Sequence, residues 1–400
     1  MRILYITSLF PPYIGGGAEI TLSNIVDGMA KRGHEVGVLT TVGEKGVNIS
    51  KENNITIYRC GIRNIYWHFS DKKPAPWKRL IWHIIDSYNF FAKVDIRRVI
   101  KDFKPDIVSC HNLSGISSVA AWVELAEKKI PTIQVLHDYY SICPKTTMFK
   151  NGHNCEQRCT FCSLPRLSHT QASNKITAVV GVSQAVLDKH LQFGLFSKVG
   201  VKKIIHNGRE PKAINSETKK HEILTFGFIG TLNPVKGIKP LLEAFVRVLA
   251  ESPKPVQLLI GGTGKTKYIS ELQQNYSSDQ IVFLGRVDPA NFFSEVDITI
   301  VPSLWNDPFP GVVFESLGSG IPVIGTKRGG IPEMIQHEKN GLLYEPDKSH
   351  ALESAILHLI KDQELLAEMK KNAKPSAASF LNVNRMIDEH EALYKQILQK

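Results

Sequence analysis

Two acidic residues, Asp307 and Glu315, bracket a turn that is rich in proline and glycine. A short helix is predicted to begin near Gly311, and the first amides of a helix have no partner within it, so the turn could bind a diphosphate. A carboxylate one turn into that helix can accept hydrogen bonds from the hydroxyl groups of a ribose. Taken singly, such acids are more often a charge at a helix N-terminus and a surface residue.

A lysine, Lys236, ends a loop that follows a predicted strand over Leu224–Ile229. In open α/β folds, ligand phosphates bind at the carboxyl edge of a parallel sheet, where a cation would neutralise them. Three glycines at 15–17 follow the first predicted strand and would let the backbone approach a ligand closely. They do not form the G-x-G-x-x-G pattern of dinucleotide-binding proteins. A solvated lysine and a tight structural turn therefore stay open as alternatives.

Three polar residues follow predicted strands in the first half of the chain. His137 ends the run Thr132–Leu136, and His111 and Asn112 follow Ile107–Cys110. This position puts their side chains at the cleft edge of the first sheet, and we interpret His111 and Asn112 as candidates for contact with an acceptor. A lone histidine is more often a satisfied structural group than a ligand.

Four of the six cysteines cluster closely, as Cys143, Cys155, Cys159 and Cys162. A cytosolic protein should not hold them as disulfides, so metal binding is the leading explanation, and four thiolates suit a tetrahedral structural zinc ion. The C-x3-C-x2-C core also resembles the iron–sulfur motif of radical SAM enzymes. Unligated thiols are the third alternative.

These groups need a scaffold, and the sequence predicts two α/β domains in tandem. Its 400 residues exceed what one hydrophobic core usually serves. Short β-branched runs alternate with amphipathic stretches, as in parallel doubly wound sheets. Strands are predicted over 2–7, 35–40, 55–59, 107–110, 132–136, 176–182, 224–229, 256–260, 281–284, 298–301 and 322–324. Helices are predicted over 21–31, 237–251 and 311–318.

The same pattern sets the domain boundaries. We predict a first domain over 1–205, a second over 206–378 and a terminal helix within 379–400. The first boundary lies at His206-Asn207-Gly208, which a polar stretch follows. The terminal helix is indicated by apolar residues that recur at helical spacing from Val383 to Ile397, and it must pack on another element.

The net charge of +11 arises entirely from an excess of basic residues in the first half. Between Arg59 and Lys104 there are eleven basic and four acidic residues, with Trp67, Trp77 and Trp82 interleaved. Basic side chains beside tryptophans on an amphipathic helix suit the surface of an anionic membrane. An ordinary solvated face with core tryptophans is the alternative. No nucleic-acid partner is expected, because no recognised binding module accompanies the charge.

No apolar run approaches the roughly 18 to 20 residues that cross a bilayer. The apolar N-terminal stretch has no small-residue cleavage site behind it, so it is interpreted as a buried first strand. We therefore expect a cytoplasmic protein that attaches peripherally to the cytoplasmic face of the inner membrane.

Four segments, PPYIGGG, GTLNPVKG, DPFPGVVFE and GGIPE, occur in an order and spacing that resemble the family 4 retaining glycosyltransferases with the GT-B fold. The resemblance covers nearly the whole chain and is most specific in the second half. It implies two Rossmann-like domains that face each other across a cleft, with a C-terminal helix crossing back to the first. The first domain would bind a glycan or lipid-linked acceptor and the second a UDP- or GDP-sugar, in bacterial surface polysaccharide or lipopolysaccharide synthesis.

By this resemblance, Lys236 neutralises the donor diphosphate and Glu315 holds the nucleotide ribose. Asp307 occupies the first acidic position of the family's E-x7-E motif, near the transferred sugar, and His137 contacts that sugar. The predicted catalytic residues are thus His137, Asp307 and Lys236. The predicted donor site comprises Gly16, Gly17, Thr231, Lys236, Phe309, Pro310, Gly311, Val312 and Glu315.

The resemblance also implies a retaining reaction that needs no cofactor and no clear protein nucleophile, and that rests on orientation and charge stabilisation. Two positions depart from the family pattern. Thr231 stands where members often have arginine, so Arg328 or Lys239 would supply the missing cation, and Asp307 is shorter than glutamate by one methylene. The rival interpretations are a GT-B epimerase or phosphorylase and a catalytically silent glycan-binding homologue.

Overall fold

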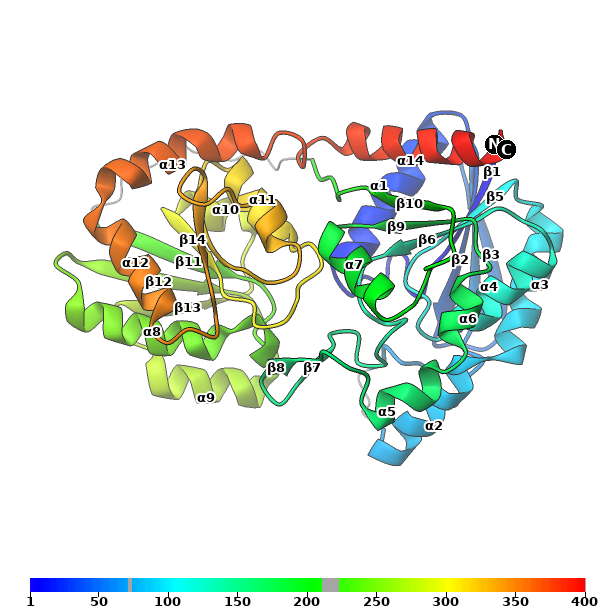
Figure 1. Ribbon diagram of the computed structural model, residues 1–400, viewed down its shortest axis with the longest axis horizontal. Helices are drawn as coiled ribbons and strands as arrows, with labels where there is room; N and C mark the ends of the chain where they lie inside the picture. The colour runs from blue at the N-terminus through cyan, green and yellow to red at the C-terminus, as the bar shows by residue number, and fades with distance from the viewer. Residues whose placement is uncertain (71–73, 211–222, 400) are drawn as a thin grey trace. The chain divides into compact units, whose positions relative to one another are not determined.

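The computed structural model describes residues 1–70, 74–210 and 223–399, and the chain divides into two compact units (Figure 1). The first unit comprises Met1–Met148, Cys155–Gly208 and Val383–Lys400, and the second comprises Phe149–Asn154 and Arg209–Asn382. Each unit contains a mainly parallel sheet with helices, which confirms the predicted fold class of two α/β domains. Nearly all of the polar stretch that follows the predicted boundary lies outside the described residues.

The first unit is built on an eight-stranded sheet in which only the edge strand β3 runs antiparallel. The chain proceeds outward from β1 on one side, then returns and adds the remaining strands on the other side, so the order reverses between β1 and β5. Across the sheet the strands are β10 (Val201–Ile204), β9 (Ala178–Gly181), β6 (Thr132–Leu136), β5 (Ile107–Cys110), β1 (Arg2–Ile6), β2 (Glu35–Val42), β4 (Ile55–Gly61) and β3 (Val47–Glu52).

Helices flank this sheet, and α1 shows why they form. Its apolar residues recur every three or four positions and are buried, and the helix is followed by Gly33, which adopts the left-handed conformation that ends helices. The helices of this unit are α1 (Gly17–Lys31), α2 (Pro76–Ser87), α3 (Phe90–Phe103), α4 (Ser118–Glu127), α5 (Thr160–Ser163), α6 (His169–Ser173), α7 (Gln184–Gln192) and α14 (Val383–Leu398), with a 3-10 turn, η1 (Leu164–Arg166).

The terminal helix α14 packs on α1 of the first unit, as the predicted return to the first domain requires. Gly28 of α1 lies so close to Ile387 that a Cβ atom at residue 28 would sit 2.2 Å from Ile387 Cδ1. Arg32 forms ion pairs with Asp388 and Glu391, each at 2.6 Å. The apolar stripe of the sequence is the buried face of this helix.

The second unit has six parallel strands in the order β13 (Ile281–Gly285), β12 (Val256–Gly261), β11 (Leu224–Ile229), β14 (Ile298–Val301), β15 (Val323–Thr326) and β16 (Gly341–Tyr344). Here the chain order reverses between β11 and β14. The other elements are α8 (Ile238–Glu251), α9 (Thr266–Tyr276), α10 (Pro289–Ser294), α11 (Gly311–Gly318), α12 (Ala351–Lys361), α13 (Gln363–Ser376), η2 (Pro234–Lys236), η3 (Ile331–Glu333) and the hairpin β7 (Phe149–Lys150) and β8 (His153–Asn154).

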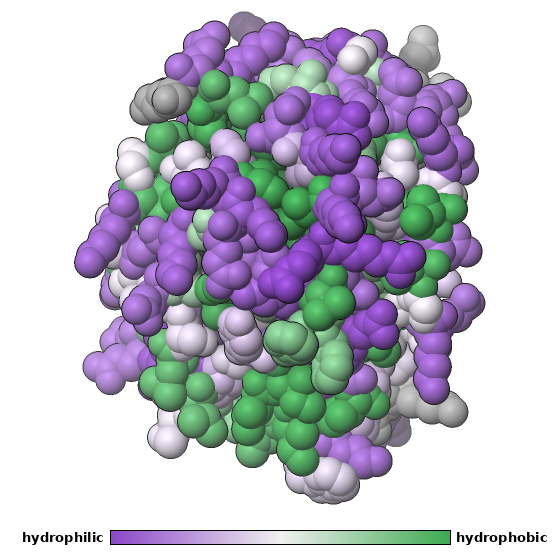
Figure 2. Space-filling model, turned by 90° about the vertical axis from the view of Figure 1, so that its right-hand side faces the viewer, coloured by the Kyte–Doolittle hydropathy of each residue, from purple (hydrophilic) through white to green (hydrophobic). Residues whose placement is uncertain are grey.

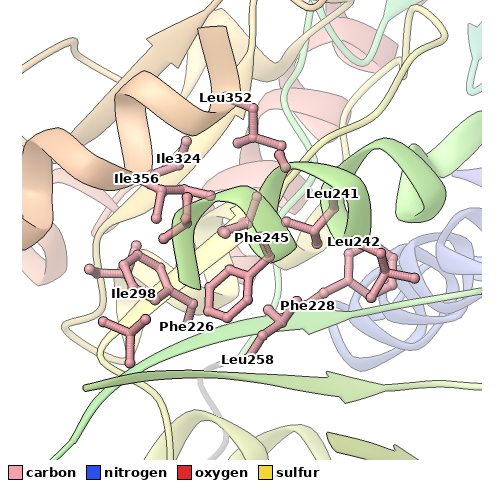
Figure 3. Packing of buried hydrophobic residues seen from close by; sticks show 14 of the residues in the cluster. Phe226, Phe228, Leu241, Leu242, Phe245, Leu258, Ile298, Ile324, Leu352 and Ile356 are labelled. Carbon is pink, nitrogen blue, oxygen red and sulfur yellow. The ribbon is translucent and has the colours of Figure 1, made fainter. Parts of the chain in front are cut away.

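The core of the second unit lies between the sheet and helices α8 and α12. Figure 3 shows Phe245 of α8 beside Phe226 of β11, with Ile356 of α12 in the same cluster. The rings of Phe226 and Phe245 meet edge to face, with their centroids 5.8 Å apart. This packing holds β11, and with it the loop that follows, in a fixed position.

The sequence did not predict β3, β10, β16 or the hairpin β7–β8, and its predicted runs for β9 and β15 start too early, at residues 176 and 322 rather than at Ala178 and Val323. Half-exposed β3 alternates polar and apolar residues at the sheet edge, so it lacks the continuous apolar run of a central strand. Pro322 was predicted as the first residue of a strand, but β15 begins at Val323. Proline has no amide hydrogen for the ladder.

The packing of α14 on α1 can be tested with a double-mutant cycle. In the Ile387→Ala background, where the added methyl group has room, Gly28→Ala should raise the free energy of unfolding by about 1 kcal/mol, because alanine has the higher helix propensity. In the wild-type background the same change should be neutral or destabilising, because the methyl group meets Ile387. Urea unfolding of the four proteins measures the coupling. A Gly28→Ala effect that is identical in both backgrounds would contradict this packing.

Candidate functional site

In the second unit, the loops after β11 and β14 lie against each other at the point where the strand order reverses. The backbone amides of Leu304 and Trp305 donate to the carbonyl oxygen of Val235, at 2.9 and 3.4 Å. Gly237 has a φ of 74°, and a Cβ atom there would sit 1.9 Å from the carbonyl oxygen of Pro302. Only glycine satisfies both conditions. This reversal point is where open α/β sheets bind ligands.

The two loops bring together Lys236 and Asp307, which the sequence predicted separately. Lys236 Nζ forms an ion pair with Asp307 Oδ2 and lies 5.6 Å from the centre of the Trp305 ring. The Asp307 side chain is 7% exposed and that of Lys236 is 27% exposed. The lysine is therefore charge-compensated yet reachable from solvent, and an incoming phosphate would compete with Asp307 for it.

The GGIPE segment, residues 329–333, packs against the backbone of Asp307. The amide of Gly330 donates to the Asp307 carbonyl oxygen at 2.8 Å. Gly329 has a φ of 54°, and a Cβ atom there would lie 2.1 Å from the same oxygen. The motif thus has a structural task, which is to fix the backbone that carries Asp307.

At the N-terminus of α11, Glu315 Oε1 is paired with Arg209 Nη1. A Cβ atom added to Gly311 would lie 3.0 Å from Arg209 Nη1, so the guanidinium covers the first residue of the helix. Burial lowers the pKa of Arg209. The sequence did not indicate a role for Arg209. It follows the predicted domain boundary directly, and no local pattern links it to a helix 106 positions away.

Other predicted donor residues offer the backbone rather than the side chain. The Phe309 ring is buried against Phe314 and Phe380, with centroid distances of 5.8 and 5.6 Å. Val312 packs against a small apolar cluster of the same unit. Pro310 is buried as well, whereas Thr231 is exposed on the loop after β11.

The two cations proposed to replace a family arginine are engaged elsewhere. Lys239 Nζ lies 4.0 Å from Glu243 on the exposed side of α8, and Arg328 is paired with Asp347. Arg209 stands closer to the predicted nucleotide turn than either, because it touches Gly311 and Glu315.

The hairpin β7–β8 adds a second residue that the sequence did not indicate. Asn154 donates from Nδ2 to the Leu304 carbonyl oxygen at 2.8 Å and accepts from the Asn306 amide at 2.9 Å. Its side-chain amide therefore clamps the loop that carries Asp307. The contact spans 150 positions in the chain, so sequence spacing gives no sign of it.

In the first unit, His111, Asn112, His137 and Asp138 line one small pocket at the carboxyl ends of β5 and β6. His111 Nδ1 and His137 Nε2 are 2.9 Å apart, and the rings stack at 5.1 Å between centroids. Burial lowers the pKa of His137 to about 4 and that of His111 well below its ordinary value. Both rings are therefore neutral at pH 7, so one nitrogen donates and the other accepts.

His111 is better placed to position His137 than to touch an acceptor. It is 3% exposed, and its second ring nitrogen, Nε2, lies 3.1 Å from Ser109 Oγ. The backbone carbonyl of Asn112 accepts from the amide and the hydroxyl of Ser8, at 2.6 and 2.8 Å. These two hydrogen bonds connect the loop after β5 to the loop after β1.

In the glycine loop after β1, a backbone amide is already hydrogen-bonded to a carboxylate. The amide of Gly16 donates to Glu19 Oε2 at 2.8 Å, and α1 begins at Gly17. A phosphate bound to this amide, as the resemblance implies, would have to replace Glu19.

The cysteine cluster lies in the segment after β6. Cys143, Cys159 and Cys162 bring their sulfur atoms close together, whereas Cys60 and Cys110 are buried in strands β4 and β5. None of the six forms a disulfide.

The basic segment between Arg59 and Lys104 has features of both interpretations of its sequence. Trp82 is fully buried, Trp67 is partly buried with Nε1 donating to Thr41, and Trp77 is exposed. Several cations are paired: Arg63 with Asp95, Lys93 with Glu127, and Arg97 with Glu124. Lys72 and Lys73 lie outside the described residues.

The exposed face of α2 is apolar instead. Trp77, Ile81, Ile84 and Tyr88 recur every three or four residues and are 41 to 61% exposed. Phe90 and Phe91 begin α3, and Leu164 and Leu167 belong to the η1 region that packs on α2. We call these eight residues the α2 patch. In the face of the molecule that Figure 2 shows, apolar side chains gather toward the lower end, which is the end at which Figure 1 places α2.

Among the residues that the structure describes, no helix combines the length and apolarity required to span a membrane.

Comparisons with known proteins agree over almost the whole chain. Residues 15–212 match the family model described as Glycosyltransferase Family 4, and residues 209–375 match the one described as Glycosyl transferases group 1. A Klebsiella pneumoniae protein, described as an uncharacterized 42.6 kDa protein in the cps region, is 31% identical over 84% of this chain and 87% of its own.

Two solved structures share the fold at 19% identity. Sucrose-phosphate synthase from Thermosynechococcus elongatus has a TM-score of 0.75 and covers 99% of each chain. Anabaena HepE, solved in complex with UDP, has a TM-score of 0.72 and covers 99% of this chain and all of its own.

The buried histidines predict that acid destabilises the first unit. Burial lowers the pKa to about 3 for His83 and His390 and to about 4 for His137 and His190. A histidine whose folded pKa lies below its unfolded value of about 6.5 favours unfolding as pH falls through 6.5 toward 4, because the unfolded chain binds the proton first. Two carboxyls oppose this. Burial raises the pKa of Asp86 and Asp138 to about 6, so they protonate in the folded state first.

These four histidines, together with His68, His111 and His169, whose pKa values burial also lowers, outweigh the two carboxyls, so the first unit should lose at least about 3 kcal/mol between pH 7.5 and 5.5. Urea unfolding followed by tryptophan fluorescence measures this, since four of the five tryptophans lie in that unit. Equal or greater stability at pH 5.5 would contradict the neutral, buried state of these rings.

Proposed function

The chain belongs to the glycosyltransferases of family 4 and group 1, and on this premise we propose that it transfers a sugar from a nucleoside diphosphate sugar to a glycan or lipid-linked acceptor, with retention of anomeric configuration. The observation that supports the proposal most strongly is the meeting of Lys236, Asp307 and the start of α11 at the strand-order reversal of the second unit.

The donor would lie along the two loops with its diphosphate at Lys236 and at the free amides of α11. As the bond between the anomeric carbon and the diphosphate oxygen breaks, negative charge grows on the leaving oxygen, and a fixed cation stabilises it. Glu315 uses one carboxylate oxygen for Arg209, and the other is available to accept from the ribose hydroxyls. Arg209 thereby orients Glu315 and adds positive charge near the phosphates.

His137 would act as a neutral hydrogen-bonding group toward the transferred sugar. With its pKa lowered to about 4, it is not a proton donor at pH 7 in the sense of a general acid. The acceptor hydroxyl would therefore lose its proton to the departing diphosphate as the new glycosidic bond forms. This matches a retaining reaction that uses no protein nucleophile.

The relative from the Klebsiella cps region supports a role in bacterial surface polysaccharide synthesis, and HepE structures with UDP and with UDP-glucose support a nucleotide-sugar donor. Incubating the full chain with UDP-, GDP- and ADP-sugars and measuring nucleotide release identifies the donor. Glycosidic product with retained configuration, seen by NMR, supports the proposal. Epimerised sugar or sugar phosphate would favour an epimerase or a phosphorylase instead.

The donor site gives a pair of mutational predictions. Lys236→Ala should lower turnover about a hundredfold or more, because the leaving-group charge loses its cation. Glu315→Gln should mainly raise the donor KM, since charge-assisted hydrogen bonds of about 1.5 to 3 kcal/mol become neutral ones. Both side chains are only about three-quarters buried, so folding should survive.

Lys239→Ala is the matched control, because Lys239 lies three residues further on and points to Glu243. It should keep wild-type rate and donor affinity. If Lys236→Ala and Glu315→Gln both behave like this control, the donor site lies elsewhere.

We further propose that the α2 patch attaches the protein to the cytoplasmic face of an anionic membrane. The patch is apolar, and basic residues accompany it: Lys78 lies over the Trp77 ring at 5.4 Å, and Arg79 follows. This combination of an apolar stripe with cations at its edge suits the interface of a bilayer. Attachment there would bring a lipid-linked acceptor to the enzyme.

Sedimentation with liposomes tests this attachment. Replacing Trp77 and Ile81 by serine should reduce binding to anionic liposomes at least tenfold, since two large side chains contribute several kcal/mol of apolar burial. Val246→Ser together with Leu284→Ser removes two similarly exposed apolar side chains from the second unit and should leave binding unchanged. Equal loss in both double variants, or no binding by the wild type, would contradict the proposal.

A further inference from the structure

The sulfur atoms in the segment after β6 are spaced like the ligands of a metal ion. Cys162 Sγ lies 3.6 Å from Cys143 Sγ and 3.4 Å from Cys159 Sγ. A disulfide would need about 2.05 Å. In a tetrahedral site with zinc–sulfur bonds of about 2.3 Å, neighbouring sulfurs are about 3.8 Å apart. The observed separations are close to the second value and far from the first.

The backbone around Met148 brings Cys155 toward this group. Met148 and Lys145 direct their amides at the Cys143 sulfur, and the carbonyl oxygen of Met148 accepts from the Cys155 amide at 2.7 Å. Amides that point at a sulfur stabilise the thiolate form, which is the form that binds metals. Met148 therefore connects the first and second cysteines of the motif through its own backbone.

Two arginines, Arg166 and Arg158, place positive charge near the thiols. The Arg166 side chain is fully buried, and its Nη2 has no hydrogen-bond partner among the described residues. Nε and Nη2 of Arg158 likewise have no hydrogen-bond partner among the described residues. Arg166 acts electrostatically on Cys143 and Arg158 on Cys162. A zinc ion with four thiolates carries a net charge of −2, which two guanidinium groups would balance.

We propose that Cys143, Cys155, Cys159 and Cys162 bind one zinc ion through four thiolates. Within the described ranges, no three or more His, Cys, Asp or Glu side chains already stand as a ready metal site, so binding of the ion would have to draw the four thiols closer together. Four thiols bind Zn²⁺ with release of four protons to solvent, and no oxidation is involved. The ion is structural, because all four positions of a tetrahedron are filled by protein.

The ion would secure the base of the hairpin that clamps the Asp307 loop. The hairpin, Phe149–Asn154, is bounded in the sequence by Met148 and Cys155, where the chain leaves and re-enters the first unit. A metal at the cysteines ties these two ends together. Its loss would free the hairpin ends and, through Asn154, loosen the loop that carries Asp307.

Metal content of the full chain tests the proposal. Protein purified in reductant without chelator should contain about one zinc per chain, and Cys155→Ser and Cys162→Ser should each retain less than about a tenth of that. Cys60→Ser is the matched control, because Cys60 is buried in β4 away from the cluster, and it should retain the metal.

Exchange of the wild type into Co²⁺ gives a second readout that does not depend on the variants folding. Four thiolates around Co²⁺ should give the intense visible absorption of a tetrahedral thiolate site. Three results would overturn the proposal: six freely titrating thiols in native, metal-free wild type, iron with acid-labile sulfide, or a mass lower by two hydrogens from a disulfide within the cluster.

Discussion

The carbonyl oxygen of Pro302 occupies the place where a side chain at residue 237 would begin, and the geometry of the second-unit site depends on this close approach. Because Gly237 has no Cβ atom, the loop after β11 can lie on the loop after β14 and accept hydrogen bonds from it. Lys236 then stands beside Asp307. Gly329 and Asn154 hold the same loop from two other sides, so the carboxylate is fixed before any ligand arrives.

The two units present chemically different groups at the carboxyl edges of their sheets. The second unit offers a charged pair, which suits recognition of a diphosphate. The first unit offers stacked neutral histidines in a small pocket, which suits hydrogen bonding to the hydroxyl groups of a sugar. Burial keeps these rings uncharged, and the same burial makes the first unit sensitive to acid.

The sequence predicted the two-domain fold and most central strands, because buried parallel strands are continuous β-branched runs that need no partner to be recognised. It also predicted Lys236 in a loop after a strand and Asp307 in a turn before a helix, and the two residues meet because β11 and β14 are adjacent. Arg209 and Asn154 could not be predicted. Their partners lie 106 and 150 positions away, and tertiary packing alone brings them together. The apolar face of α2 was not predicted, because the sequence pattern drew attention to the basic residues of this segment, of which Arg63 and Arg97 are paired with carboxylates.

A bound nucleoside diphosphate should displace Asp307 from Lys236, and calorimetric titration of Asp307→Asn measures this competition. Whichever of UDP, GDP and ADP binds the wild type should bind this variant about tenfold more tightly, because the competing carboxylate charge is gone. The matching nucleoside, which has no phosphate, should show no such gain. A diphosphate that binds both proteins equally, or the variant more weakly, would contradict the account.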